Sequence, residues 1–171
     1  MNKKRNGGLS REEYTAFHEA GHAVAAYLMG HRIHCVSIKE DDDYEGRCIT
    51  LRKRPKRLDV NSLRTVKEEE LIILRAGLIA TIIRTKGQHF DYWGIVQDEK
   101  VMQECLEEIF ADDPEVKKAL LLWIAHFTYY MFTYEPHWRA VEAVARELLA
   151  HQEIGARKAT KIIKDTCAAY M

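Results

Sequence analysis

Apolar residues recur at helical spacing along most of the chain and alternate with polar residues in only one short region. The helical pattern predicts six helices, at residues 10–29, from 62 or 66 to 84, 96–110, 114–134, 136–152 and 156–170. The alternating, β-branched segments 32–40 and 47–53 flank the polar turn 41–46 and predict an antiparallel hairpin. We therefore expect one mostly α-helical domain over residues 1–171, with a small antiparallel β-sheet near its N-terminal third.

The first helix has clear signals at both ends. Ser10 and Glu13 form a capping-box pattern, and Gly30 follows the last apolar position. Residues 1–9 are expected to be flexible, and the basic, polar stretch 52–61 is expected to be a mobile loop.

Composition narrows the classes of function. The formal net charge is zero and 47% of the 171 residues are hydrophobic, so no overall charge favours nucleic acid or an anionic membrane. The basic cluster at 51–57 is interpreted as a solvated loop. No apolar run reaches the roughly 20 residues of a membrane span, and no apolar signal segment follows the basic N-terminus. Four scattered cysteines are typical of reduced thiols, so we expect a cytoplasmic protein.

Residues 18–22 read HEAGH, with His18 and His22 four positions apart on the predicted first helix. Side chains at this spacing project side by side, so both imidazoles can bind one zinc ion. Glu19 points to one side of the pair, where it can accept a proton from the water on the ion. A pair of hydrogen-bonded core histidines is the alternative interpretation.

The histidines border the apolar face of this helix, so both are expected to face the interior or its rim. Gly21 lies between them, although glycine costs about 1 kcal/mol relative to alanine inside a helix. Its presence indicates that another element packs closely there.

Zinc needs a third protein ligand, and helical register favours Asp98. Asp98 lies at spacings of four, seven and eleven from Met102, Cys105 and Ile109, which places it at the head of an apolar face. The alternative is that Asp98 is simply stabilised near a helix N-terminus. The other residues considered were His89, Asp91, His126, interpreted as a core histidine, and His137, interpreted as a helix-start residue.

The segments FHEAGHAVAAYLMG, IHCVSI, GRCITL, LRAG and GIVQD, in this order, resemble the peptidase domain of FtsH-type ATP-dependent zinc proteases. The resemblance covers roughly residues 14–110. It implies a zincin-like helical peptidase fold, zinc ligands His18, His22 and Asp98, and Glu19 as the general base. It also implies a peptide or flexible protein as substrate, with an extended peptide bound along the strand near Val36 and Ile38 or its hairpin partner.

The chain departs from that family in several ways. It has no ATPase module, no phosphate-binding glycine loop and no membrane helix. Tyr92 and Trp93 replace the family's twin threonines, and residues 78–81 replace its alanine-alanine-glutamate run. Without an unfolding motor, such a peptidase would cut only flexible segments or small peptides, unless it has a partner ATPase or forms a homo-oligomer.

Two other functions remain open. One is a catalytically silent regulatory or scaffold protein that keeps the metal helix as structure, with His89 or Asp91 closing the site. The other is a hydrolase of small molecules. Glu19 favours an enzyme, because a structural site needs no base. Tyr44, Tyr92 and His89 are possible stabilisers of an oxyanion, and Trp93, Trp123 and Trp138 are interpreted as core residues.

Overall fold

The computed structural model describes residues 9–40, 46–51, 53–55, 57, 59–87, 93–110 and 113–169, without the side chains of residues 93 and 94. Within them the chain is mostly helical, with a small antiparallel sheet. The helices and strands are α1 Arg11–Leu28, β1 Arg32–Ser37, β2 Arg47–Leu51, α2 Val60–Thr85, α3 Trp93–Phe110, α4 Pro114–Thr133, α5 Glu135–His151, β3 Glu153–Gly155 and α6 Ala156–Ala168. No helix of the described ranges is long and apolar enough to cross a membrane.

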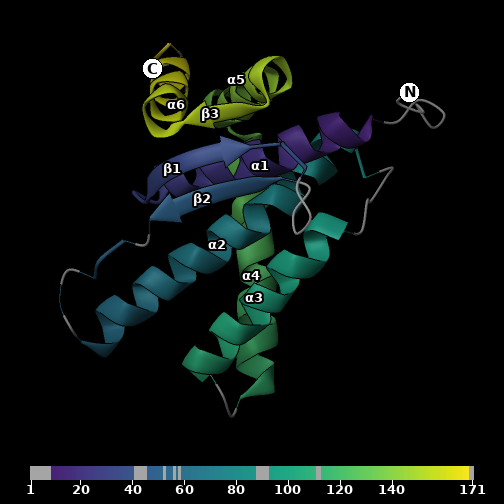
Figure 1. The fold of residues 1–171 in the computed structure, drawn as a ribbon. Coiled ribbons are helices and arrows are strands. Elements are labelled where there is room, and N and C mark those ends of the chain that lie inside the picture. Colours follow the sequence, from purple (N-terminus) through teal and green to yellow (C-terminus); the bar gives the residue numbers. More distant parts are fainter. Residues whose placement is uncertain are drawn as a thin grey trace.

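Helix α1 is the centre of the fold. Its predicted capping box is present: the Ser10 hydroxyl accepts from the Glu13 amide at 3.1 Å, and the Glu13 carboxylate accepts from the Ser10 amide at 2.8 Å. Every residue from Tyr14 to Ala26 is buried. Figure 1 shows why: the sheet lies along α1, with α5 and α6 at one side and α2, α3 and α4 at the other.

The predicted hairpin is confirmed, and a third strand joins it. β1 pairs antiparallel with β2 and also with β3, which gives the order β2-β1-β3. β3 was not predicted, because its three residues are too few to show an alternating pattern. β2 is therefore an edge strand of the described sheet.

Two helices start earlier than their patterns predict. α2 begins at Val60, where the Asp59 side chain accepts from the Ser62 amide at 2.9 Å, so the end of the expected 52–61 loop is helical. α3 begins at Trp93, so Asp98 lies in its second turn. At this position Asp98 gains less from the helix N-terminus than the alternative interpretation assumes, because that favourable effect falls off after the first turn.

Helices α1 and α2 cross at unusually small residues. A Cβ on Gly21 would lie 2.5 Å from the Ala76 carbonyl oxygen and 2.8 Å from the Ala80 Cβ. The close packing expected from Gly21 is therefore confirmed, and α2 is the element that provides it. This crossing brings the backbone of α2 directly against the HEAGH segment.

A polar cluster fixes the C-terminal end of α1. The buried His31 places its Nε2 3.2 Å from a carboxylate oxygen of Glu69 on α2. The Lys53 ammonium donates to Glu69 at 2.8 Å and to the Met29 carbonyl at 3.1 Å. These bonds join α1, α2 and the segment after β2, and they hold the helix that carries the two histidines of HEAGH.

Candidate metal centre

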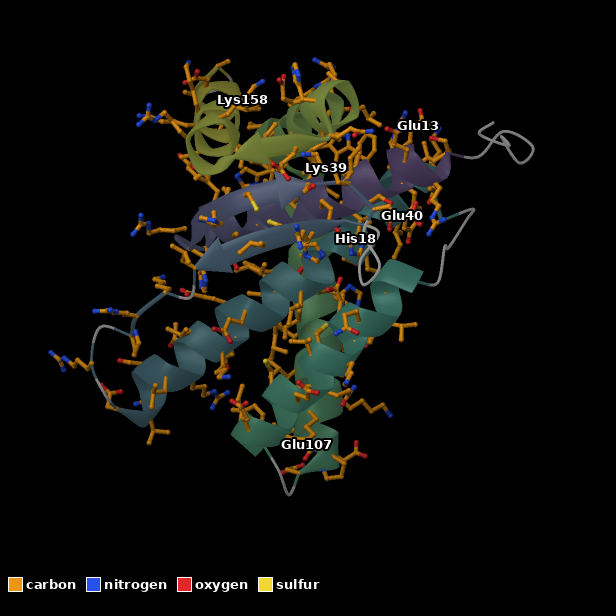
Figure 2. All side chains as sticks on the ribbon, viewed as in Figure 1. Glu13, His18, Lys39, Glu40, Glu107 and Lys158 are labelled. Carbon is orange, nitrogen blue, oxygen red and sulfur yellow. The ribbon has the colours of Figure 1, made fainter. Side chains whose placement is uncertain are left out.

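Three predicted ligands from two distant segments come together in the structure. The Nε2 atoms of His18 and His22 are 3.0 Å apart, and an Asp98 carboxylate oxygen lies 3.0 Å from the first and 3.1 Å from the second. Figure 2 shows His18 in the region where α1, β2 and the start of α3 approach one another. Both histidines are buried, and the Asp98 side chain is 21% exposed.

The separations fit a small tetrahedral ion. Ligand atoms at about 2.0–2.1 Å from zinc in tetrahedral geometry are about 3.3–3.4 Å apart. The triangle of His18, His22 and Asp98 is only a few tenths of an ångström tighter. A single proton can join only two of the three atoms, whereas a cation can contact all three at once. The donor set of two imidazoles and one carboxylate is also one that zinc accepts.

The surroundings of His22 favour the tautomer that a metal ligand needs. Its Nδ1–H donates to the Ile73 carbonyl of α2 at 2.7 Å, which leaves the Nε2 lone pair directed at the cluster. His18 has no such support: its Nδ1 is buried and has no hydrogen-bond partner within the described residues. The polar contacts of the His18 ring are therefore all on its Nε2 side, where an ion would bind.

Helix α2 leaves a gap for the imidazoles at Gly77, one turn after Ile73. A Cβ at Gly77 would lie 2.5 Å from His22 Nε2 and 2.7 Å from His18 Cε1. Only glycine therefore fits at this position while both rings keep their places. The sequence contained a signal for this contact, an isolated glycine inside a long helical pattern, but the pattern alone does not identify its neighbours.

An ion pair between α2 and α3 lies next to Asp98 in the sequence. The Arg75 guanidinium donates to the Glu99 carboxylate at 2.7 Å, and the Arg75 side chain is only 13% exposed. This ion pair fixes the N-terminal half of α3 against α2 and thereby keeps Asp98 within reach of the histidines. Arg75 and Glu99 were not identified from sequence, because their pairing depends on the crossing of two helices.

His22 and Asp98 shift each other's pKa values in opposite directions. Burial lowers the pKa of His22, but the charge of Asp98 and its hydrogen bond outweigh this effect and raise it to about 9. Burial also opposes ionisation of Asp98, yet the two imidazoles hold the pKa of its carboxyl below the ordinary value. These opposite shifts describe a site in which a proton balances the carboxylate, and a metal cation would take the place of that proton.

Glu19 is buried beside the cluster. Burial raises the pKa of Glu19, and the neighbouring imidazoles of His18 and His22 partly counteract that rise. The chain approaches this carboxylate at Gly46, where a Cβ would lie 3.2 Å from Glu19 Cγ and 2.5 Å from Thr15 Cγ2. The residue before β2 therefore packs closely against the aliphatic part of the Glu19 side chain.

The other residues considered for the site fall into two groups. His126 is exposed on α4, so its interpretation as a core histidine is wrong, and Trp123 is half exposed instead of buried in the core. His137 lies in the first turn of α5 and interacts with the Met131 carbonyl through Nδ1, as expected for a helix-start residue. The remaining candidates lie outside the described residues or have no described side chain: Tyr44, His89, Asp91, Tyr92 and Trp93.

The four cysteines do not contribute to the cluster. All four are free thiols, and burial raises the pKa of the Cys48 thiol well above its ordinary value. Among the described residues, the His, Cys, Asp and Glu side chains that gather closely enough for one ion are those of His18, His22 and Asp98.

No protein-family model matches the chain, and no curated protein matches its sequence.

Proposed function

We propose that the protein is a zinc-dependent metallopeptidase, in which His18, His22 and Asp98 hold the ion and Glu19 is the general base. The observation that carries this proposal is the convergence of three ligand atoms within 3.1 Å of one another, beside a buried carboxylate. When bound, zinc supplies Lewis acidity that polarises the scissile carbonyl and makes a water molecule more acidic.

The role of Glu19 follows from its position. It adjoins His18 in the sequence but is not one of the three clustered ligands, so its carboxylate remains available for proton transfer. Burial raises the pKa of Glu19, which makes it a stronger base than an exposed glutamate. Glu19 would take a proton from the attacking water and pass it to the leaving amine. A base in this position has no use in a purely structural site.

The edge strand β2 supports a peptide as the substrate. Its outer edge has no neighbouring strand among the described residues, and an extended peptide can add to such an edge through main-chain hydrogen bonds. β2 begins at Arg47, directly after Gly46, which packs against Glu19. A peptide paired with β2 would therefore pass close to the proposed base. This mode requires an unfolded segment, so flexible proteins and short peptides are the proposed substrates.

One observation favours a second function. His18, Glu19 and His22 are each less than 8% exposed, and deep burial is also typical of a metal site that only stabilises a fold. A catalytically silent metal-binding protein would keep its zinc but cleave nothing.

The two functions are separated by Glu19→Gln, which keeps the size of the side chain and removes the base. Purified wild-type protein should carry close to one zinc per chain by elemental analysis and should cleave casein. Glu19→Gln should carry the same zinc and lose cleavage by several orders of magnitude. Glu12→Gln, in the first turn of the same helix, is the matched control and should cleave at the wild-type rate.

Three results would count against the peptidase. Wild-type protein that carries zinc but cleaves no flexible substrate would favour the silent protein. Equal cleavage by wild type and Glu19→Gln would trace the activity to a contaminant or to another base. Protein without any bound metal would remove the basis of both functions.

A further inference from the structure

The outward side of α4 is unusually apolar for a helix at a protein surface. Between Ala119 and Tyr134 the sequence contains no aspartate, glutamate, lysine or arginine. One side of the helix packs into the core through residues such as Ile124 and Phe132, and α2 is its main neighbour. A helix that is uncharged on all sides is normally buried on all sides. In Figure 1, α4 lies behind α3, and this view does not show its outward side.

The outward side exposes several large side chains, which we call the outer α4 face. Their exposed fractions run from 39% for Val116 to 77% for Tyr130. Trp123, at 50%, stacks on Phe127 with ring centroids 5.2 Å apart. The outer α4 face consists of Val116, Leu122, Trp123, Tyr129, Tyr130 and Tyr134.

The size of this face matches one half of a dimer interface. With about 150–250 Å² for each large side chain, its exposed parts amount to roughly 650 Å². The largest apolar patch on an ordinary monomer is about 300–600 Å². A stable interface buries about 800 Å² on each partner, and the polar neighbours of the six side chains would supply the rest.

The order of side chains along the face is self-complementary. His126 is exposed and lies midway between Ala119 and Thr133, between Trp123 and Tyr129, and between Leu122 and Tyr130. If two copies of α4 pair antiparallel about a two-fold axis at His126, the small residues Ala119 and Thr133 oppose each other, and Tyr134 opposes the stem of Lys118. Each of the large residues Leu122 and Trp123 then opposes a tyrosine. Antiparallel pairing also aligns the two helix dipoles favourably.

From this face we infer that the protein forms a homodimer in which α4 packs antiparallel against α4 of a second copy. From Ala119 to Tyr134 the face offers no lysine or arginine with which to attract a nucleic acid or an anionic membrane. The exposed Glu115 and Lys118 lie only at its N-terminal end and have opposite charges. A second copy, in contrast, supplies both the apolar surface and the matching order of side chains. This inference does not depend on the proposed peptidase activity.

Sedimentation equilibrium of the full chain tests the interface. Wild-type protein should have twice the monomer mass of 19.9 kDa at micromolar concentration. Trp123→Glu and Tyr130→Glu should each be monomers there, with dimer affinity weakened at least a hundredfold, since burying an unpaired charge is costly. Val60→Glu is the control, because Val60 is 79% exposed but lies at the start of α2. Unchanged zinc content and circular dichroism would show that the variants fold.

Cysteine cross-linking tests the orientation. A mixture of Ala119→Cys and Thr133→Cys proteins should give mainly the mixed cross-link, because these two positions meet across an antiparallel pair. The parent chain with its own four cysteines is the blank. Mainly like-with-like cross-links would overturn the antiparallel arrangement. A monomeric wild type would overturn the dimer itself. If that monomer binds phosphatidylglycerol vesicles through Trp123, the outer α4 face is a membrane-binding surface instead.

Discussion

Gly77 lies so close to His22 that a single added methyl group would be 2.5 Å from Nε2, the ring nitrogen that faces His18 and Asp98. The distance is shorter than any ordinary contact between a carbon and a nitrogen, so the ring or the helix must move if the methyl group is present. Gly77 belongs to α2 and makes no bond to an ion. Its contribution is the space that it leaves for the ligands.

Gly77→Ala should therefore weaken zinc binding by about 10–100-fold, the range typical of changes around a metal ligand. The helix itself should not suffer, since alanine is favoured over glycine by about 1 kcal/mol inside a helix. Competition with a zinc-binding dye measures the affinity. Gly155→Ala is the control, because nothing lies within 4 Å of a Cβ at that position. Wild-type affinity in Gly77→Ala would show that the imidazoles do not need this gap.

Gly46→Ala should impair the base and spare the metal. The new Cβ would crowd Glu19 Cγ at 3.2 Å and Thr15 Cγ2 at 2.5 Å. None of the three atoms nearest to this Cβ belongs to His18, His22 or Asp98. We expect cleavage of casein to fall about 10–100-fold, as for a small displacement of a catalytic group, with unchanged zinc content.

The change Thr15→Ser offers a rescue for that variant. It removes the crowded methyl group and keeps the hydroxyl that donates to the Arg11 carbonyl at 3.0 Å. The double variant Thr15→Ser, Gly46→Ala should recover part of the lost activity, whereas Thr15→Ser alone should behave as wild type. Strictly additive effects in this cycle would contradict a direct clash.

Asp98→Asn tests the ligand that comes from α3. The change keeps the shape of the side chain but removes the negative charge that balances the cation. Zinc affinity should fall by more than about 100-fold, beyond the loss typical of an outer-shell change. Glu104→Gln, exposed on the same helix, loses the same charge and should bind zinc as wild type does. Equal affinities of Asp98→Asn and wild type would remove Asp98 from the ligand set.

Metal removal should lower thermal stability. An ion that binds only the folded chain stabilises it by about 2.7 kcal/mol at a free concentration one hundred times Kd. For a domain of this size that corresponds to about 5–10 °C in the melting temperature. Glu19→Gln is the protein to use, because self-cleavage cannot then distort the melting curve. If chelator leaves the melting temperature of Glu19→Gln unchanged, the folded core does not contain a metal site that stabilises it.

The sequence predicted those features that depend on near neighbours. The capping box at Ser10, the hairpin and the side-by-side histidines each follow from residues within one or two turns or strands. Asp98 was identified because helical register directs its side chain to the core, and the structure brings it to the histidines.

Features that depend on tertiary packing were not predicted. The contact of Gly77 with His22 and the pairing of Arg75 with Glu99 require knowledge of how helices cross. His126 and Trp123 were interpreted as core residues because their helix is apolar all round, and a pattern without polar positions cannot show which side is covered. β3 was missed because three residues carry too little pattern.

Because β1 pairs with β3, the sheet can be completed only after the C-terminal part of the chain has been synthesised. His18, His22 and Asp98 all emerge from the ribosome well before Ile154, the β3 residue that pairs with Val36 at the centre of the sheet. The nascent chain thus holds a full set of ligands while one edge of β1 is still open. Such long-range strand pairing is slow to form, so an ion captured early would join α1 to α3 before β3 completes the sheet.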